Sequence, residues 1–318
     1  MIEVEHLSKD YGTANAVQDV SFRVGKGEVL GFLGPNGAGK TTTMRILSCY
    51  MAPSGGTARI AGFDILENSL EVRRHIGYLP ENAPLYTEMT VRDYLSYIAA
   101  LRGVPKSKRA ERIEAALDAG KLEDYADTLI RKLSKGYRQR AGIAQAVIHD
   151  PPVLILDEPS AGLDPRQRVE TRRFIKSLAQ DHTIILSTHI LPDVQETCSR
   201  VVIINGGRII AEDTPANLAA ARGAADHISV LVRRPSHDAA QKLGRIQAVL
   251  NVRREGESEN RSSEHSLFAL DIKPGSDARE EVARLVVNEG WGLLELSRRR
   301  ASLEDVFIEL TTSDEQET

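Results

Sequence analysis

The chain has 318 residues, a formal net charge of -4 and a pI near 6.1. Because one domain usually holds about 100–200 residues, this length suggests two domains. The apolar share of 41% and the charged share of 27% are typical of a folded globular protein. They exclude a largely disordered chain, and the slightly acidic balance argues against a surface built mainly to bind nucleic acid.

The first residues, 1–6, have neither the basic stretch nor the apolar stretch of a signal peptide. The longest apolar runs, at 153–156, 183–186 and 201–204, are far shorter than the ~20 residues that cross a bilayer as a helix. Only Cys49 and Cys198 are present, far apart and without the spacing of a metal site, so we expect a protein of the reducing cytoplasm. We expect the short apolar runs to be buried parallel strands.

Residues 1–220 alternate such strands with amphipathic helices, which predicts an α/β domain whose sheet is covered on both faces. A stretch of small residues at 219–225 suggests a linker. Residues 227–318 then predict a small α+β domain in the β-α-β-β-α-β order of a ferredoxin-like fold. Its expected strands are 228–232, 248–254, 267–272 and 293–297, and its expected helices are 236–245 and 276–289.

The strongest motif is an unbroken G-x-x-x-x-G-K-[ST] sequence, placed after the apolar run 29–33 and before a helical run. Its glycines let successive backbone N–H groups face phosphate oxygens, and the following helix points its positive end at the same anion. A Gly-rich surface turn is the alternative, which the flanking strand and helix disfavour. The residues expected to bind nucleotide here are Gly34, Pro35, Asn36, Gly37, Ala38, Gly39, Lys40, Thr41 and Thr42.

Lys40 is expected to reach the β- and γ-phosphates of ATP, and the Thr41 hydroxyl to bind Mg²⁺. A second buried strand, 153–157, ends in two acids at the edge where open α/β sheets keep their ligands. We expect Asp157 to hold Mg²⁺ and Glu158 to orient or deprotonate the attacking water. Considered alone, the pair could be exposed charge that simply ends a strand.

Three further motifs indicate which kind of phosphate-loop protein this is. Residues 133–140 resemble the signature motif of ABC ATPases, residues 160–165 their D-loop, and residues 186–189 their switch-histidine motif. These motifs occur in the family's order over residues 1 to about 215. The resemblance implies a P-loop ABC ATPase fold in which two such domains close face to face, so that each ATP lies between the phosphate loop of one and the signature motif of the other. The partner would be a second copy or a paired ABC ATPase.

The resemblance also implies residue roles. Ser134 and Gly136 would contact the γ-phosphate, Asp164 would act in the D-loop, and Tyr11 would lie against adenine. His189 would donate to the γ-phosphate, although a lone histidine after an apolar strand is more often a hydrogen-bonded core residue.

The chain departs from the family pattern in three places. Lys135 replaces the usual first glycine of the signature, and Tyr137 replaces the usual glutamine. Residues 77–81 align with the family's Q-loop and place Glu81 where a glutamine is usual. Glu81 could ligate Mg²⁺, or it could be an ordinary exposed loop acid.

The segments 77–81 and 302–307 resemble ABC-2 exporter ATPases, including gliding-motility-type subunits. This branch implies an ATP-hydrolysing subunit on the cytoplasmic face of the membrane, paired with a membrane-spanning ABC permease. The alternatives are a soluble ABC-type ATPase acting in DNA or translation processes, and a catalytically silent regulatory module. The presence of both Glu158 and Lys40 disfavours the silent module.

Overall fold

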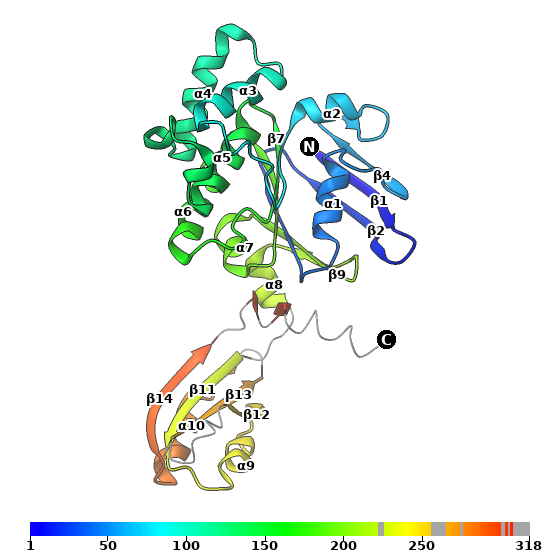
Figure 1. Cartoon of the computed structure of the whole chain (residues 1–318). Helices are drawn as coiled ribbons and strands as arrows, with labels where there is room; N and C mark the ends of the chain where they lie inside the picture. The colour runs from blue at the N-terminus through cyan, green and yellow to red at the C-terminus, as the bar shows by residue number, and fades with distance from the viewer. Residues whose placement is uncertain (222–225, 256–264, 274–275, 300–302, 305, 308–318) are drawn as a thin grey trace. The chain divides into compact units, whose positions relative to one another are not determined.

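Figure 1 shows a computed structural model of the chain, which describes all residues except 222–225, 256–264, 274–275, 300–302, 305 and 308–318. The chain divides into two compact units, Met1–Pro215 and Ala216–Thr318. The division lies at the start of helix α8 (Pro215–Ala221), and the boundary expected near residue 220 lies within the same helix.

A six-stranded sheet forms the centre of the first unit, in the order β10-β9-β3-β8-β7-β6. All neighbouring strands are parallel except β10, which is antiparallel to β9. Strands β3, β7 and β8 are buried along their whole length, as expected of parallel strands covered on both faces. The strands are β3 (Val29–Leu33), β6 (Ile76–Leu79), β7 (Val153–Asp157), β8 (Thr183–Thr188), β9 (Arg200–Asn205) and β10 (Arg208–Asp213).

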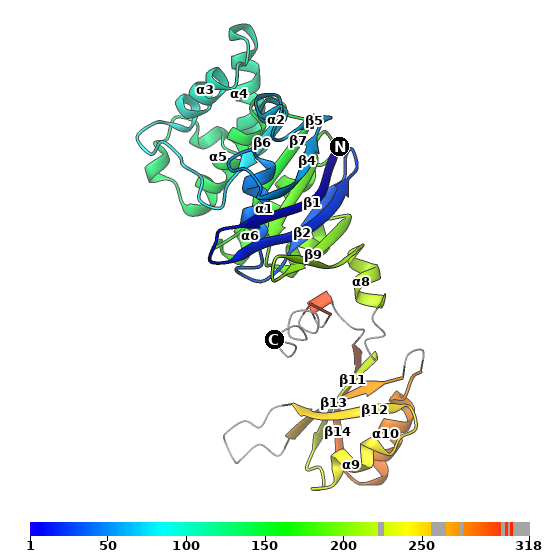
Figure 2. The ribbon, with the colours of Figure 1, turned by 90° about the vertical axis from the view of Figure 1, so that its right-hand side faces the viewer.

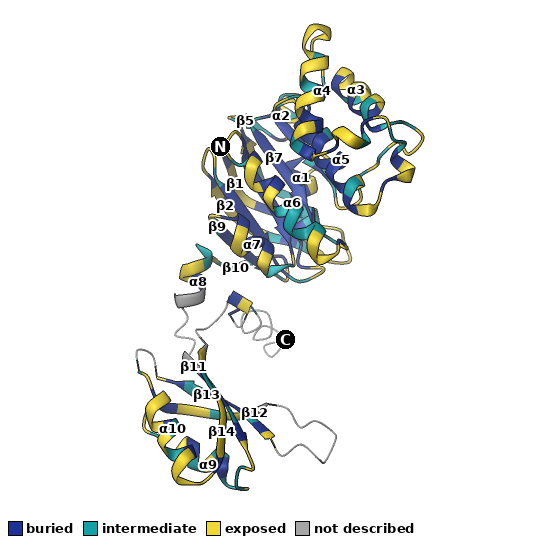
Figure 3. Ribbon diagram, turned by 90° about the vertical axis from the view of Figure 1, so that its left-hand side faces the viewer, coloured by how far each residue is buried: buried dark blue, intermediate teal, exposed yellow. Residues whose placement is uncertain are grey.

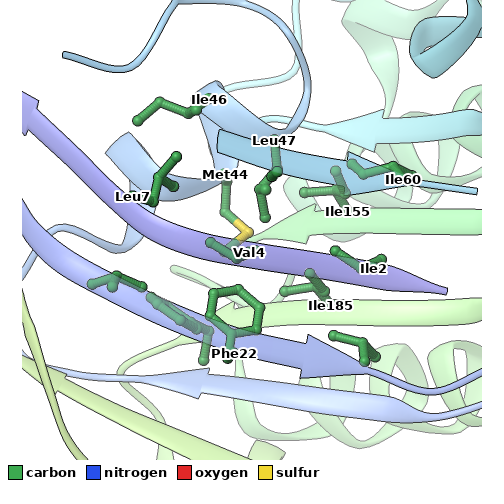
Figure 4. Close-up of a cluster of buried hydrophobic side chains, with 14 of the residues drawn as sticks. Ile2, Val4, Leu7, Phe22, Met44, Ile46, Leu47, Ile60, Ile155 and Ile185 are labelled. Carbon is green, nitrogen blue, oxygen red and sulfur yellow. The ribbon is translucent and has the colours of Figure 1, made fainter. Parts of the chain in front are cut away.

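A second sheet, in the order β2-β1-β4-β5, is antiparallel (Figure 2). Its strands are β1 (Ile2–Asp10), β2 (Asn15–Val24), β4 (Gly55–Ile60) and β5 (Phe63–Asp64). Helix α1 (Lys40–Leu47) lies between the two sheets, and its Met44 and Leu47 share one core with Val4 of β1 and Ile155 of β7 (Figure 4). The expectation of a single sheet did not include this second layer, since β1 pairs through irregular registers that break its apolar alternation.

Helices cover the rest of the central sheet. Helix α5 packs on β6 and β7, and α7 packs on β3 and β8. Helices α3 and α4 join α5 around a separate apolar core, while the outer side of α4 is exposed (Figure 3). The helices are α2 (Ser69–His75), α3 (Val91–Leu101), α4 (Lys106–Gly120), α5 (Lys135–Val147), α6 (Pro165–Leu178) and α7 (Leu191–Thr197), with 3-10 turns at Glu123–Tyr125 and Ile130–Lys132. Among the helices that the structure describes, none is long and apolar enough to cross a membrane.

The second unit has the predicted β-α-β-β-α-β order of elements. Its antiparallel sheet has the strand order β12-β13-β11-β14, and a core that includes Val230, Leu243, Val282 and Trp291 joins the sheet to its helices. The elements are β11 (Asp226–Arg233), α9 (Ala239–Gly244), β12 (Val249–Glu255), β13 (His265–Ile272), α10 (Arg279–Asn288) and β14 (Gly292–Arg299). Part of the 302–307 segment lies outside the described residues.

Candidate functional site

The phosphate loop follows β3 and leads into α1, and two of its glycines are required by the packing around them. A Cβ on Gly34 would lie 2.4 Å from the carbonyl oxygen of Ile204. Gly39 has a φ of 102°, and a Cβ there would lie 2.3 Å from the carbonyl oxygen of Ala16. No other residue type could take these positions without moving the backbone. The motif's spacing therefore reflects a loop packed tightly between β2 and β9.

Lys40 is the first residue of α1 and its side chain is buried. Its ammonium group donates to the carbonyl oxygens of Gly34 at 2.8 Å and Pro35 at 3.0 Å, and lies 3.3 Å from Oε1 of Glu158. A cation is thus held at the centre of the loop, next to the end of strand β7.

Asp157 ends strand β7 and is fully buried. Its Oδ1 accepts hydrogen bonds from the hydroxyls of Ser187 at 2.5 Å and Thr41 at 3.3 Å, while its Oδ2 is buried without a hydrogen-bond partner. Burial raises the pKa of Asp157 above its usual value, because a buried charge loses its hydration. A buried carboxylate oxygen without a donor, beside a threonine hydroxyl, is a donor set that fits a Mg²⁺ ion.

Glu158 follows directly, in the left-handed region with a φ of 50°, which is uncommon for a residue with a side chain. Its N–H donates to the backbone oxygen of Ser187, and its buried carboxylate accepts from Nδ1 of His189 at 2.9 Å. The two acids that end β7 therefore have different surroundings. One faces hydroxyl groups, and the other lies between Lys40 and His189.

These groups converge because β3, β6, β7 and β8 are parallel, so their carboxyl ends meet at one edge of the sheet. A pocket of about 360 Å³ opens there. Nine predicted site residues line it together with Ala161 of the 160–165 motif and with Ala16, which the sequence did not indicate. The nine are Asn36, Gly37, Gly39, Lys40, Thr41, Thr42, Glu81, Glu158 and His189. We call this the phosphate-loop pocket.

Ala38 and Tyr11, which the sequence also predicts to bind nucleotide, do not line this pocket. Ala38 is buried beneath the loop, and its carbonyl oxygen accepts the N–H of Gly207. Tyr11 is not among the lining residues. It is about half exposed, and its hydroxyl contacts the sulfur of Met51 at 3.2 Å. The proposed contact of Tyr11 with adenine therefore stays a prediction.

A second pocket, of about 310 Å³, gathers the remaining predicted residues, Ser134, Gly136 and Asp164. Ser134 caps α5 by accepting the N–H of Tyr137 at 3.4 Å, and Asp164 caps α6 by accepting the N–H of Gln167 at 2.9 Å. Two helix N-termini, which favour anions, therefore border one pocket. The pocket is also lined by two further residues of the 133–140 motif, Tyr137 and Arg140, and by three residues that the sequence did not indicate, Arg166, Gln167 and Glu170. We call this the signature pocket.

No group of three or more His, Cys, Asp and Glu side chains in the described part of the chain could hold a metal ion. A Mg²⁺ ion bound at Asp157 would therefore take further ligands from nucleotide phosphates and water, as this ion usually does.

A phosphate loop after a buried strand, with two acids at the end of a neighbouring parallel strand, defines the class of P-loop ATPases. The family model "ABC transporter" matches residues 17–161. The chain is 36% identical to the daunorubicin resistance ATP-binding protein DrrA2 of Streptomyces coeruleorubidus, over 98% of this chain and 94% of that protein. It is 35% identical to the Nod factor export ATP-binding protein I of Paraburkholderia xenovorans, over 99% of this chain and 98% of that protein.

Solved structures agree. The ATP-binding subunit of an ABC transporter superimposes with a TM-score of 0.64 at 32% identity, covering 70% of this chain and 93% of that one. A dimeric ATP-binding cassette bound to ADP and Pi has a TM-score of 0.62 over 67% of this chain and 98% of that one, and at 23% identity it supports the fold alone. The chain belongs to the family of ABC transporter ATP-binding proteins. It is an ATP-binding and ATP-hydrolysing subunit, as its motifs predict.

Proposed function

We propose that this subunit works in a pair that closes on Mg-ATP and reopens after hydrolysis, and that this cycle drives export through a separate membrane-spanning permease. The observation that carries the proposal is the separation of two pockets on one unit. One contains the phosphate loop and the acids that end β7, and the other contains the N-termini of α5 and α6. Each pocket holds only part of the predicted ATP-contacting set, so a second subunit would complete the site.

Within the phosphate-loop pocket, Asp157 and Thr41 would hold Mg²⁺, with Glu81 as a further candidate ligand. The ion, when bound, neutralises charge on the phosphate oxygens. Lys40 would contact the β- and γ-phosphates, and its present carbonyl contacts at Gly34 and Pro35 place its ammonium at the loop.

Glu158 would orient the attacking water and accept its proton. His189 lies 2.9 Å from that carboxylate and lines the same pocket, which supports a role for His189 in contacting the γ-phosphate as well as Glu158. The contact also restrains the Glu158 side chain, and positioning of the reacting groups is, with electrostatic stabilisation, what a protein contributes to phosphoryl transfer.

In the signature pocket, Ser134, Gly136 and Asp164 would contact the ATP bound at the phosphate loop of the paired subunit. Tyr11 would lie against the adenine. Both a homodimer and a pair with a similar ABC ATPase satisfy this arrangement.

Export is the favoured direction because relatives named for Nod factor export and for daunorubicin resistance match nearly the whole chain, including the second unit. The subunit would then lie on the cytoplasmic face of the membrane, bound to its permease, and nucleic acid has no part in this proposal.

The test is phosphate release by the purified chain with ATP and Mg²⁺, alone and with its permease in lipid vesicles. We expect hydrolysis that requires Mg²⁺, and a faster rate with the permease. Equal rates with and without the permease in sealed vesicles would contradict coupling to transport.

A further inference from the structure

Ser187 is a fully buried side chain that the assigned motifs leave without a role. It is the fifth residue of the six-residue strand β8, and in the parallel register it lies directly beside Asp157 of β7. Its hydroxyl donates to Oδ1 of Asp157 at 2.5 Å and accepts the N–H of Glu158 at 3.1 Å. A hydroxyl carries one donor and two acceptor positions, so both bonds can exist together.

The bond to Asp157 decides which carboxylate oxygen is available. Oδ1 accepts from both Ser187 and Thr41, and Oδ2 is left buried without a partner. Without the Ser187 hydroxyl, Asp157 would keep only the longer bond from Thr41, at 3.3 Å. The carboxylate could then rotate, and its free oxygen would no longer have a fixed direction.

The bond to Glu158 acts on the backbone. Glu158 has a left-handed φ of 50°, which side-chain-bearing residues rarely adopt unless neighbouring contacts impose it. Its N–H is held by both the hydroxyl and the carbonyl oxygen of Ser187. This anchor fixes the direction in which the Glu158 side chain leaves the strand, toward Lys40 and His189.

We propose that Ser187 is a positioning residue that holds the metal-binding and the water-orienting carboxylates in one fixed arrangement. This inference rests on the roles proposed above for Asp157 and Glu158. Ser187 touches neither nucleotide nor water in this scheme. Its effect passes through the two acids, so its loss should affect metal affinity and turnover while leaving the phosphate loop intact.

The test compares Ser187→Ala and Ser187→Thr with the full-length parent. Mn²⁺ replaces Mg²⁺ as the probe, and its affinity is measured by electron paramagnetic resonance in the presence of a non-hydrolysable ATP analogue. We expect Ser187→Ala to weaken Mn²⁺ binding by about tenfold, the lower end of what residues that orient metal ligands contribute. Phosphate release should fall by about 10–100-fold, and nucleotide affinity measured in EDTA should stay within about twofold of the parent. Ser187→Thr, which keeps a hydroxyl, should recover much of both losses.

Thr183→Val is the matched control. Thr183 is a buried residue at the other end of β8, and its hydroxyl accepts the N–H of Gly27 at 2.9 Å, away from both acids. If Ser187→Ala and Thr183→Val lower the unfolding temperature and turnover alike, with Mn²⁺ affinity unchanged, Ser187 is only structural and the inference is overturned. Parent-like Mn²⁺ affinity and turnover in Ser187→Ala would also overturn it. A parent that needs no divalent metal to release phosphate would instead contradict the proposed function itself.

Discussion

At the scale of single residues, we expect the charged groups of the phosphate-loop pocket to act in different steps, some in ATP binding and others in hydrolysis. Lys40 is held by loop carbonyl oxygens, whereas Glu158 reaches the same pocket from the end of β7. We therefore expect the ammonium of Lys40 to act on the phosphates and the carboxylate of Glu158 to act on the attacking water. Replacing Lys40 should therefore impair ATP binding, and replacing Glu158 should impair hydrolysis.

We predict that Lys40→Ala abolishes tight ATP binding, because the phosphate-loop pocket loses the buried ammonium group of Lys40. Glu158→Gln should keep ATP affinity within a few-fold and lower the rate of phosphate release by at least about 100-fold, because an amide cannot accept the proton of water. Binding is measured by calorimetry and turnover by phosphate release. A Glu158→Gln chain that hydrolyses ATP at the parent's rate would remove Glu158 from the mechanism.

The buried carboxylate of Asp157 is expected to lower the stability of the fold while providing a ligand for Mg²⁺. Burial raises its pKa, so its folded-state pKa lies above the unfolded value. For such a group, the folded form is favoured below the unfolded pKa, and that contribution is lost as pH rises through the folded pKa. Near neutral pH without metal, the charged carboxylate therefore opposes folding.

We predict that Asp157→Asn raises the unfolding temperature measured without nucleotide and metal at pH 7, because an amide removes the buried charge and can still accept from Ser187 and Thr41. The same substitution should abolish the further stabilisation that the parent gains from Mg-ATP. Scanning fluorimetry with and without Mg-ATP tests both expectations, and parallel scans at pH 5 should show a smaller difference between the two proteins. An Asp157→Asn chain that melts below the parent without ligand would show that the carboxylate stabilises the fold.

At the scale of elements, the carboxyl ends of the central strands could be predicted from the sequence, because a short motif directly follows each of these strands. The phosphate loop, the acids ending β7 and the histidine after β8 each follow an apolar run, and parallel strands bring their carboxyl ends together. The antiparallel sheet of β1, β2, β4 and β5 was not predicted, since its pairing joins distant segments through irregular registers. Ala16 of β2 and the hydroxyl of Ser187 were missed for the same reason. Their positions depend on which strands are neighbours, and local spacing carries no signal for that.

At the N-terminus of α5, the contribution of Ser134 to helix stability can be separated from its proposed contact with ATP. Ser134 caps α5 in the signature pocket, and Thr90 caps α3 by accepting the N–H of Asp93 at 3.1 Å, in neither pocket. We predict that Ser134→Ala and Thr90→Ala each lower the free energy of unfolding by about 1 kcal/mol, the usual cost of losing a cap. Only Ser134→Ala should also lower ATP turnover, by at least about tenfold, because it alone removes a donor proposed to face γ-phosphate. Denaturant melts and phosphate release would separate the two effects, and equal activity in both variants would assign Ser134 to capping alone.

At the scale of the whole molecule, all the residues that line the two pockets belong to the first unit, within Met1–Pro215. One chain therefore offers a phosphate-loop pocket and a signature pocket as distinct surfaces. In a symmetric pair each pocket would face its complement, so that two subunits form two equivalent sites. The boundaries proposed for the accessory region 227–318, and its role, stay predictions.

Mixing two variants that are each expected to hydrolyse ATP poorly tests this arrangement. A Lys40→Ala pair has two damaged phosphate loops, and a Ser134→Ala pair has two damaged signature pockets, so each ATP site in either pair lacks one half. In a mixed pair, one site receives both defects and the other joins an intact phosphate loop to an intact signature pocket. With random exchange at equal concentrations, half of the pairs are mixed, and one of the two sites in each mixed pair is intact. We therefore predict that phosphate release recovers to about a quarter of the parent's rate if the sites act independently.

Mixing Lys40→Ala with Glu158→Gln is the control, because both defects lie in the phosphate-loop pocket and every site then contains one of them. If the Lys40→Ala and Ser134→Ala mixture releases no more phosphate than its two components measured alone, while co-purification of differently tagged chains shows that mixed pairs form, the two pockets do not complete each other across the pair.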